Sequence, residues 1–157
     1  MKTRNKKTRN KKIRNKKTRK QLLYYGGTLD NYLIVDSPRK MIFTEKISGN
    51  IAGEIEYSYK DRDSLDIKLI FINEEYRNKG LSTLFLKYFI QNKFDTYPSL
   101  TDITLENRIG SDQFPISDES VKNTIRKIYS NLGFTYKHEG DPYLGNDMIL
   151  HKDAFIN

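Results

Sequence analysis

The sequence contains no cysteine and only two histidines, His138 and His151. Without cysteine the chain has no disulfide bond, no thiolate nucleophile and no cysteine-ligated zinc site, which agrees with an intracellular location in the cytoplasm or nucleus. Two histidines do not supply the side chains that a histidine metal site or a serine–histidine triad requires. We therefore expect neither a bound metal nor either of these catalytic centres.

Long apolar runs are also missing. No stretch approaches the roughly 20 apolar residues of a membrane-spanning helix, and no apolar segment follows the basic N-terminus as it would in a secretory signal. The chain of 157 residues is 36% hydrophobic and 12% aromatic. It is therefore long enough for one domain with a real core and too short for two.

Positive charge is concentrated at the N-terminus. Residues 1–20 contain 12 Lys and Arg and no acid, whereas the other 137 residues contain 16 basic and 20 acidic side chains. This tail repeats a pentapeptide, Lys-Thr-Arg-Asn-Lys at 2–6 and 7–11, and Ile13 is its one apolar residue after Met1. We expect residues 1–20 to be disordered when free and residues 21–157 to form the folded domain.

Two interpretations of the tail remain open. A run of this charge suits binding to nucleic acid or another polyanion, nuclear targeting, or attraction to an anionic surface. A low-complexity extension that only keeps the protein soluble has the same composition.

The rest of the chain is organised around residues 65–82. Leu65, Ile67, Leu69 and Phe71 alternate with polar residues, and Ile70 and Ile72 then make both faces apolar, which predicts a strand entering a covered interior. A polar turn at 73–75 ends the strand. Leu81, Leu84, Phe85, Tyr88 and Phe89 follow at helical spacing and predict a helix with one apolar stripe.

The start of this helix carries the segment Arg77-Asn78-Lys79-Gly80-Leu81-Ser82. Unpaired N–H groups and the positive end of the helix dipole suit a phosphate there, and a glycine lets the backbone approach closely. The alternative is a glycine tolerated in a first helical turn between two solvated basic side chains.

Two motifs in this order resemble the GNAT superfamily of N-acetyltransferases. Arg77-x-x-Gly80-x-Ser82 between a strand and an amphipathic helix is similar to the family's acyl-coenzyme A motif, Arg/Gln-x-x-Gly-x-Gly/Ala, with serine at the last position. The segment 128–134, Ile-Tyr-Ser-Asn-Leu-Gly-Phe, is similar to the family's Leu-Tyr-x-x-x-Gly-Phe. The resemblance extends over residues 40–152.

The resemblance implies an α/β fold with a mixed, mostly antiparallel central sheet of about six or seven strands, one splayed parallel pair, and flanking helices. One helix is expected from Leu81. Ser117 is the cap candidate of a second helix, whose first turn contains Asp118 and Glu119 and whose stripe ends at Leu132, and Asn107–Ser117 is expected to be a loop. The predicted strands are Tyr32–Val35 at an edge, Met41–Ile47, Ile51–Tyr59, Leu65–Ile72, Ile103–Leu105, Phe134–Lys137 and Met148–His151.

The resemblance also implies a donor, acetyl-coenzyme A, whose thioester arm lies between the splayed strands. Backbone groups of Ile70, Phe71 and Ile72 would pair with the pantetheine amides, and the segment 77–82 would bind the phosphates. Asn107 matches a strand-end asparagine of the family, although the inserted loop changes its spacing to Tyr129.

The implied chemistry is direct transfer of an acetyl group to an amine, without a covalent enzyme intermediate. Tyr129 matches the family residue that faces the thioester sulfur as a general acid, or else it is a helix-face tyrosine packed under the last strand. Glu106 and Asp66 are the carboxylates expected nearest the acceptor, and a water chain is the alternative base.

The sequence therefore predicts an N-acetyltransferase acting on a protein lysine or N-terminus, a polyamine or a small molecule. Two other classes stay open. One is a catalytically inactive GNAT-like module that binds acyl-coenzyme A. The other is a nucleic-acid-binding protein that acts through residues 1–20.

Overall fold

A computed structural model of the chain describes residues 28–105, 119–137 and 147–156. The basic tail, the expected loop Asn107–Ser117 and the site candidates Glu106 and Asn107 lie outside these ranges. No described helix is both long enough and apolar enough to cross a membrane.

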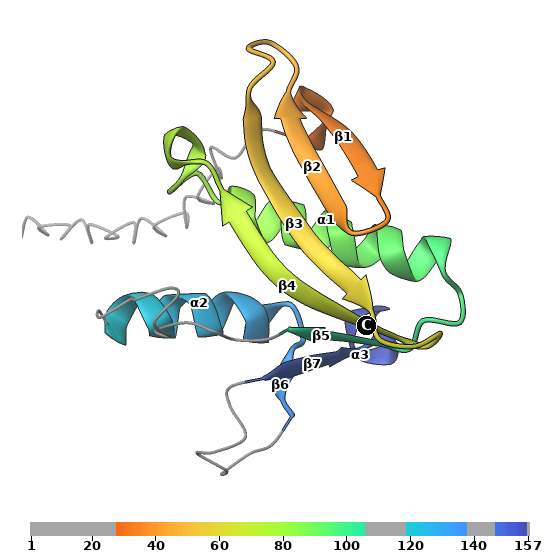
Figure 1. The fold of residues 1–157 in the computed structure, drawn as a ribbon. Coiled ribbons are helices and arrows are strands. Elements are labelled where there is room, and N and C mark those ends of the chain that lie inside the picture. Colours follow the sequence, from red (N-terminus) through yellow and green to blue (C-terminus); the bar gives the residue numbers. More distant parts are fainter. Residues whose placement is uncertain (1–27, 106–118, 138–146, 157) are drawn as a thin grey trace, which may run out of the picture.

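One sheet of seven strands forms the centre of the molecule (Figure 1), in the order β1-β2-β3-β4-β5-β7-β6. All neighbours are antiparallel except β4 and β5, which are parallel. The strands are β1 (Tyr32–Ser37), β2 (Lys40–Glu45), β3 (Ile51–Tyr59), β4 (Ser64–Ile72), β5 (Asp102–Leu105), β6 (Thr135–Tyr136) and β7 (Met148–His151). The predicted mixed α/β architecture with a single parallel pair is confirmed.

Helix α1 (Leu81–Thr96) connects the two parallel strands and crosses behind the sheet in Figure 1. Helix α2 (Glu119–Asn131) lies beside the C-terminal ends of β4 and β5. Helix α3 (Lys152–Ile156) follows β7 directly. Two short 3₁₀ turns complete the described structure, η1 (Leu29–Asn31) and η2 (Glu74–Tyr76).

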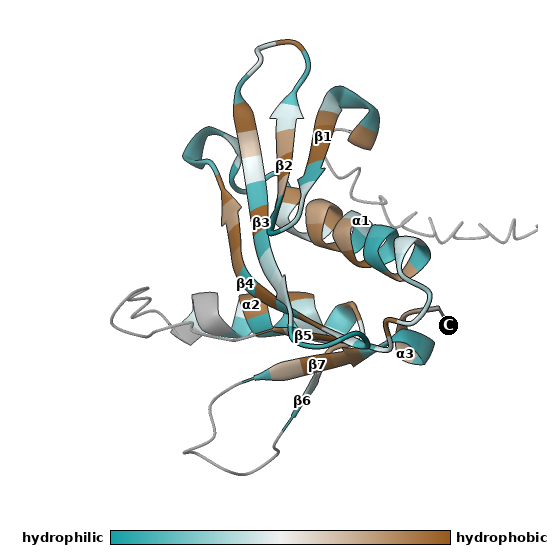
Figure 2. Cartoon of the chain, turned by 45° about the vertical axis from the view of Figure 1, so that its right-hand side comes forward, coloured by the Kyte–Doolittle hydropathy of each residue, from teal (hydrophilic) through white to brown (hydrophobic). Residues whose placement is uncertain are grey.

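The core lies between α1 and the sheet. Phe85 of α1 stacks on Phe43 of β2 with ring centroids 4.0 Å apart, and both side chains are fully buried. In Figure 2 the first turns of α1 and the strand β4 are largely brown, so both consist mainly of hydrophobic residues. Leu86, Phe89 and Ile90 are buried as well, so α1 buries a broader face than the predicted stripe.

The second half of α1 is fixed by a buried lysine. Lys93 is 0% exposed, and its Nζ donates hydrogen bonds to Asp36 Oδ2 at 2.6 Å and to Tyr57 Oη at 2.7 Å. The same ammonium lies 4.1 Å from the centroid of the Tyr57 ring. A buried charge needs such partners, so this cluster ties α1 to β1 and β3.

The opposite face of β1 to β4 carries no helix among the described residues (Figure 1). We call it the open face. Apolar side chains stand exposed there or at the strand ends, including Leu33, Val35 and Phe71. The expectation that the end of β4 enters a covered interior is therefore wrong, because Phe71 is 41% exposed and Ile70 and Ile72 are only partly buried.

Other differences from the predicted elements concern boundaries. Strand β2 ends at Glu45 and not at Ile47, because the turn before β3 already begins at Lys46. The predicted strand at 134–137 is reduced to β6, and the five-residue helix α3 was not predicted because it is too short for a periodic pattern.

Candidate functional site

The site begins where β4 and β5 part. The two strands pair only from Ser64 with Asp102 to Ile67 with Leu105. On the other side of β4 the register to β3 shifts at the same point, since Tyr57 pairs with Ile67 but Glu56 pairs with Leu69. This leaves Lys68 as an extra, bulged residue, and a bulge bends and twists its strand. Beyond it β4 diverges from β5 (Figure 1).

Backbone groups past the bulge alternate in direction. The N–H of Asn73 donates to the carbonyl of Ala52 at 3.0 Å, and the carbonyl oxygen of Phe71 lies 2.7 Å from where a Cβ on Gly53 would be. Phe71 therefore directs its N–H and C=O toward β3, whereas Ile70 and Ile72 direct theirs away from it. We call the gap where β4 and β5 diverge the fork. Of the three residues expected to pair with pantetheine, only Ile70 and Ile72 direct their backbone N–H and C=O groups toward it.

The turn between β4 and α1 contains two left-handed residues, Asn78 with φ 60° and Gly80 with φ 74°. Gly80 is the residue before α1 and no side chain caps the helix. The N–H groups of the first turn, at Leu81, Ser82 and Thr83, therefore lack intrahelical partners and point out of the helix end.

Two cations flank this helix end, as predicted. Arg77 and Lys79 are exposed, and Arg77 Nε donates a hydrogen bond to the carbonyl oxygen of Ile72 at 3.0 Å. This contact holds the guanidinium at the edge of β4 that faces the fork. It also occupies one of the carbonyls that the sequence had assigned to pantetheine.

Tyr76 anchors the turn to the β2–β3 hairpin. Its hydroxyl donates to Glu45 Oε2 at 2.8 Å, and Ser48 Oγ donates to the same oxygen at 2.7 Å. The hydrogen bonds from Ser48 and Tyr76 lower the pKa of Glu45. The turn between β4 and α1, which contains two left-handed residues, is thus held by a side-chain contact between two residues that are 31 positions apart in the sequence.

Replacing Tyr76 with phenylalanine should lower the Tm by about 2–5 °C, since it removes one hydrogen bond to a charged acceptor. A carboxylate whose pKa is lowered by folding stabilises the protein above its unfolded pKa, and this stabilisation is lost as the pH falls through the lowered value. The difference in Tm between Tyr76→Phe and wild type should therefore be present at pH 7 and shrink in acid. Tyr88→Phe is the control, and an equal loss there would contradict the assignment.

A cavity of about 190 Å³ opens between the end of β4, the first turns of α1, and α2. Its walls are mainly apolar, and Ser82 and Tyr129 bring hydroxyl groups to it. The lining residues are Ile70, Ile72, Ser82, Leu86, Ile125, Ile128 and Tyr129. The cavity joins residues from both GNAT-like motifs, which are far apart in the sequence.

Tyr129 lies both against the core and in the wall of the cavity. It packs against the core, with its ring centroid 6.1 Å from that of Phe134, and it also lines the cavity. Burial raises its pKa to about 12, because the phenolate would lose its hydration. The hydroxyl therefore stays protonated at neutral pH.

Three cavity residues escaped the sequence reasoning as site residues, namely Leu86, Ile125 and Ile128. Ile125 and Ile128 belong to the apolar stripe of α2, which predicts core packing, and Leu86 lies outside the predicted stripe of α1. Nothing in the spacing of these residues shows that α2 packs against β4 and α1. The candidate base Asp66 does not line this cavity, and its Oδ2 lies 3.3 Å from Lys68 Nζ.

No protein-family model matches the sequence, and no curated protein matches it. Similar solved structures include spermidine N-acetyltransferase from Vibrio cholerae in complex with coenzyme A and spermine, at 17% identity and a TM-score of 0.55 over 76% of this chain and 68% of that one. A GNAT-family acetyltransferase from Staphylococcus aureus is 21% identical, with a TM-score of 0.52 over 71% of this chain and 66% of that one.

The ribosomal-protein-S18-alanine N-acetyltransferase from Escherichia coli is 16% identical, with a TM-score of 0.52 over 78% of this chain and 70% of that one. The chain thus spans about two thirds of the length of each of these structures. At these identities the likeness establishes the fold, and the predicted GNAT resemblance is confirmed at that level. The chain has the fold of the GNAT acetyltransferases.

Proposed function

We propose that this protein transfers an acetyl group from acetyl-coenzyme A directly to an amine. The observation that carries the proposal is the junction of an uncapped helix end with an apolar cavity at a fork between parallel strands. The helix end suits phosphates and the cavity suits an uncharged acyl arm.

In this proposal the N–H groups at 81–83, with Arg77 and Lys79, bind the phosphates of the donor. The fork-facing backbone groups of Ile70 and Ile72 pair with the amides of the arm, apart from the carbonyl that Arg77 Nε already contacts. The apolar walls exclude water from the thioester. These residues fit the donor in both charge and polarity.

Tyr129 then acts on the leaving sulfur. Attack by the amine forms a C–N bond and breaks the C–S bond, so negative charge develops on sulfur. A phenol with a pKa of about 12 is a weaker acid than a thiol, whose pKa is about 8.5. Tyr129 therefore stabilises the thiolate by donating a hydrogen bond, and the proton that ends on sulfur comes from the amine.

Removal of that proton from the amine needs a base. Glu106, which follows β5 in the sequence, remains the first candidate and lies outside the described residues. Asp66 is the second, and its Oδ2 lies 3.3 Å from Lys68 Nζ.

An acceptor screen tests the proposal. The full-length protein is incubated with acetyl-coenzyme A and a panel of amines, including spermidine, peptides with free N-termini and small alkylamines, and free thiol is measured. We expect amine-dependent thiol release. Binding of the donor by calorimetry without release for any amine would instead favour an inactive binding module.

We further propose that residues 1–20 are a separable electrostatic arm. The arm carries 12 positive charges and the remaining residues carry a net of −4. Opposite net charges on the two parts support a polyanion, such as nucleic acid, as partner of the arm alone.

Deleting residues 1–20 should leave folding and donor binding unchanged and abolish any affinity for nucleic acid. Binding by the intact protein should fall steeply with log salt, because each neutralised phosphate releases counterions. A control with the 12 basic residues changed to glutamine keeps the length and should behave like the deletion. Unfolding of the deletion variant, or an unchanged salt slope, would contradict a separable arm.

A further inference from the structure

A second cavity lies at the same fork on the opposite side of the sheet. It has a volume of about 140 Å³, and Asp66 and Lys68 of β4 and Thr104 and Leu105 of β5 contribute to its walls, together with Lys60, Lys137 and Asp147. Leu65, Ile67 and Ile103 are fully buried in the core. Since side chains alternate along a strand, Asp66 and Thr104 face away from that core, toward the open face.

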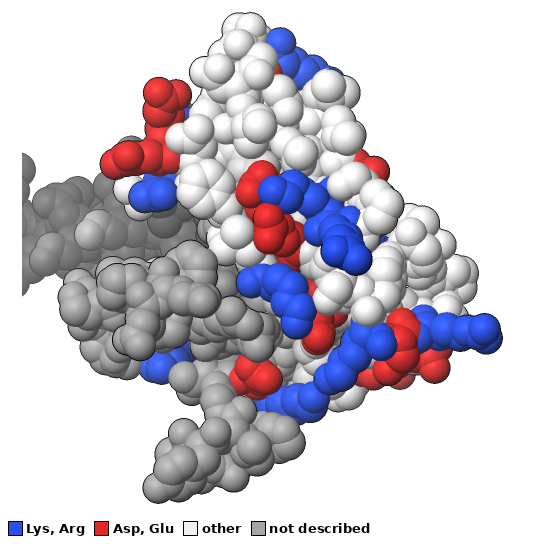
Figure 3. Space-filling view, in the orientation of Figure 1, with Lys and Arg blue, Asp and Glu red and all other residues white. Residues whose placement is uncertain are grey.

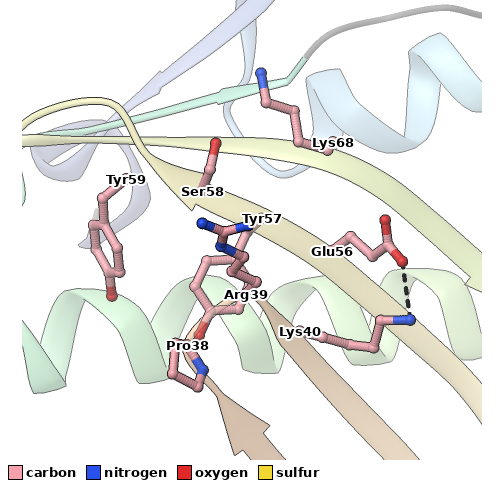
Figure 4. Close-up of a pocket in the computed structure, with 8 residues that line it drawn as sticks. All are labelled: Pro38, Arg39, Lys40, Glu56, Tyr57, Ser58, Tyr59 and Lys68. Atoms are coloured by element: carbon pink, nitrogen blue, oxygen red, sulfur yellow. Dashed lines mark ion pairs between the residues drawn. The ribbon is translucent and has the colours of Figure 1, made fainter.

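Lys68 lines both this fork cavity and a larger groove of about 600 Å³. The groove runs along β3 where β2 begins, and Figure 4 shows its eight lining residues. They are Pro38, Arg39, Lys40, Glu56, Tyr57, Ser58, Tyr59 and Lys68. Figure 3 shows basic and acidic side chains next to one another on this part of the open face.

The residues that line the fork cavity and the groove have a net positive charge, although residues 21–157 as a whole have a net negative charge. Five basic and three acidic side chains line them, whereas residues 21–157 carry more acids than bases. Lys40 is neutralised by Glu56 at 2.9 Å and Glu54 at 3.1 Å. The guanidinium of Arg39, by contrast, makes no ion pair or side-chain hydrogen bond with any described residue.

The positions follow from the strand registers. Asp66 pairs with Ser58, and the N–H of Tyr57 donates to the carbonyl of Arg39. The backbones of Arg39 and Asp66 are thus about two strand spacings apart, or roughly 10 Å. Lys68 stands between the fork cavity and the groove.

The direction of the donor connects these hollows to the reaction. If its phosphates sit at the start of α1, next to Ile72, its arm runs back along β4 past Ile70 toward the bulge at Lys68. The acyl end then reaches the fork, and the fork cavity approaches the same point from the open face. This step rests on the proposed function.

We infer that the acceptor amine enters from the open face and carries an anionic group, which Arg39 binds while the amine lies beside Asp66. Since the backbones of Arg39 and Asp66 lie roughly 10 Å apart, we expect an acceptor whose charged groups are several bonds apart.

Three six-carbon amines test the charge preference at constant length: 6-aminohexanoate, hexylamine and 1,6-diaminohexane. We expect kcat/KM of the full-length protein for 6-aminohexanoate to exceed that for the diamine by at least about tenfold. Including 6-aminohexyl phosphate distinguishes a carboxylate from a phosphate. Equal values for all amines, or a preference for the diamine, would overturn the inference.

Arg39→Gln should lower the ratio of kcat/KM between 6-aminohexanoate and hexylamine about tenfold, mainly through KM. Lys87→Gln, on α1 and outside both hollows, is the control and should leave the ratio unchanged. An unchanged ratio in Arg39→Gln would count against the inference.

Direct binding separates this inference from the proposed function. Titration of 6-aminohexanoate into the protein, followed by calorimetry, should show binding to wild type and weaker binding to Arg39→Gln even if no amine is acetylated. In that event the proposed function fails and the anion site stands. Thiol release with hexylamine but no binding of 6-aminohexanoate would support the proposed function and overturn the anion site.

Discussion

Replacing Gly80 with aspartate should abolish the binding of acetyl-coenzyme A, whereas replacing it with asparagine should weaken binding much less. Gly80 has φ 74° and directly precedes the first N–H groups of α1. Aspartate and asparagine tolerate this left-handed conformation better than other residues and have nearly the same volume. They differ in one negative charge, placed where the donor phosphates would lie.

The expected losses of affinity for acetyl-coenzyme A in the two variants differ because of that charge. A Cβ restricts the approach of the phosphates in both variants, and we expect about a tenfold loss of affinity from it. A carboxylate beside a phosphate adds repulsion in a partly desolvated site, so Gly80→Asp should lose at least about 100-fold.

Calorimetric titration with acetyl-coenzyme A measures both affinities, and circular dichroism shows whether both variants fold. Each variant should lose similar stability, about 1–2 kcal/mol, since each forces a non-glycine residue into the left-handed region. Equal affinities for Gly80→Asp and Gly80→Asn would remove the phosphates from this helix end.

The strand, turn and helix around Gly80 could be predicted from the sequence because the signals are local. Alternation in β4, a polar turn, and helical spacing from Leu81 each lie within a few neighbouring residues. The direction of the backbone at Ile70, Phe71 and Ile72 could not, because it depends on the bulge at Lys68 and on the register with β3. One residue of shift reverses which groups face the fork.

The other features that could not be predicted from the sequence depend on contacts between residues far apart in the chain. Lys93 follows Phe89 by one helical turn, and nothing local shows that a lysine there is buried against Asp36, 57 positions away. The meeting of α2 with β4 and α1 likewise depends on the sheet order β4-β5-β7-β6. The sequence also did not predict that one face of the sheet would be open, because an alternating strand pattern does not show whether a helix covers the polar side of the strand.

Replacing Tyr129 with phenylalanine should lower kcat by about 10- to 10⁴-fold and change the affinity for acetyl-coenzyme A little. Phenylalanine keeps the ring that packs near Phe134 and fills the same wall of the cavity. Only the hydroxyl is lost, and in the proposed reaction it interacts most strongly with sulfur as the C–S bond breaks. Tyr136→Phe, on the exposed strand β6, is the matched control.

The pH dependence adds a second readout. With a pKa of about 12, Tyr129 stays protonated through the range in which kcat is measured, so Tyr129→Phe should lower the rate profile between about pH 6 and 10 without changing its shape. A general acid with a pKa inside that range would instead remove the alkaline limb.

Stability in alkali reports on the burial of the same hydroxyl. Because folding raises the pKa of Tyr129, the neutral phenol stabilises the fold fully below the unfolded value of about 10, and this stabilisation is lost as the pH rises toward the folded value. Tyr129→Phe should therefore lose less stability than wild type between about pH 9 and 11. A wild-type turnover number together with this alkaline effect would leave Tyr129 as a packed helix-face residue, and a reduced turnover number would place its hydroxyl at the leaving sulfur.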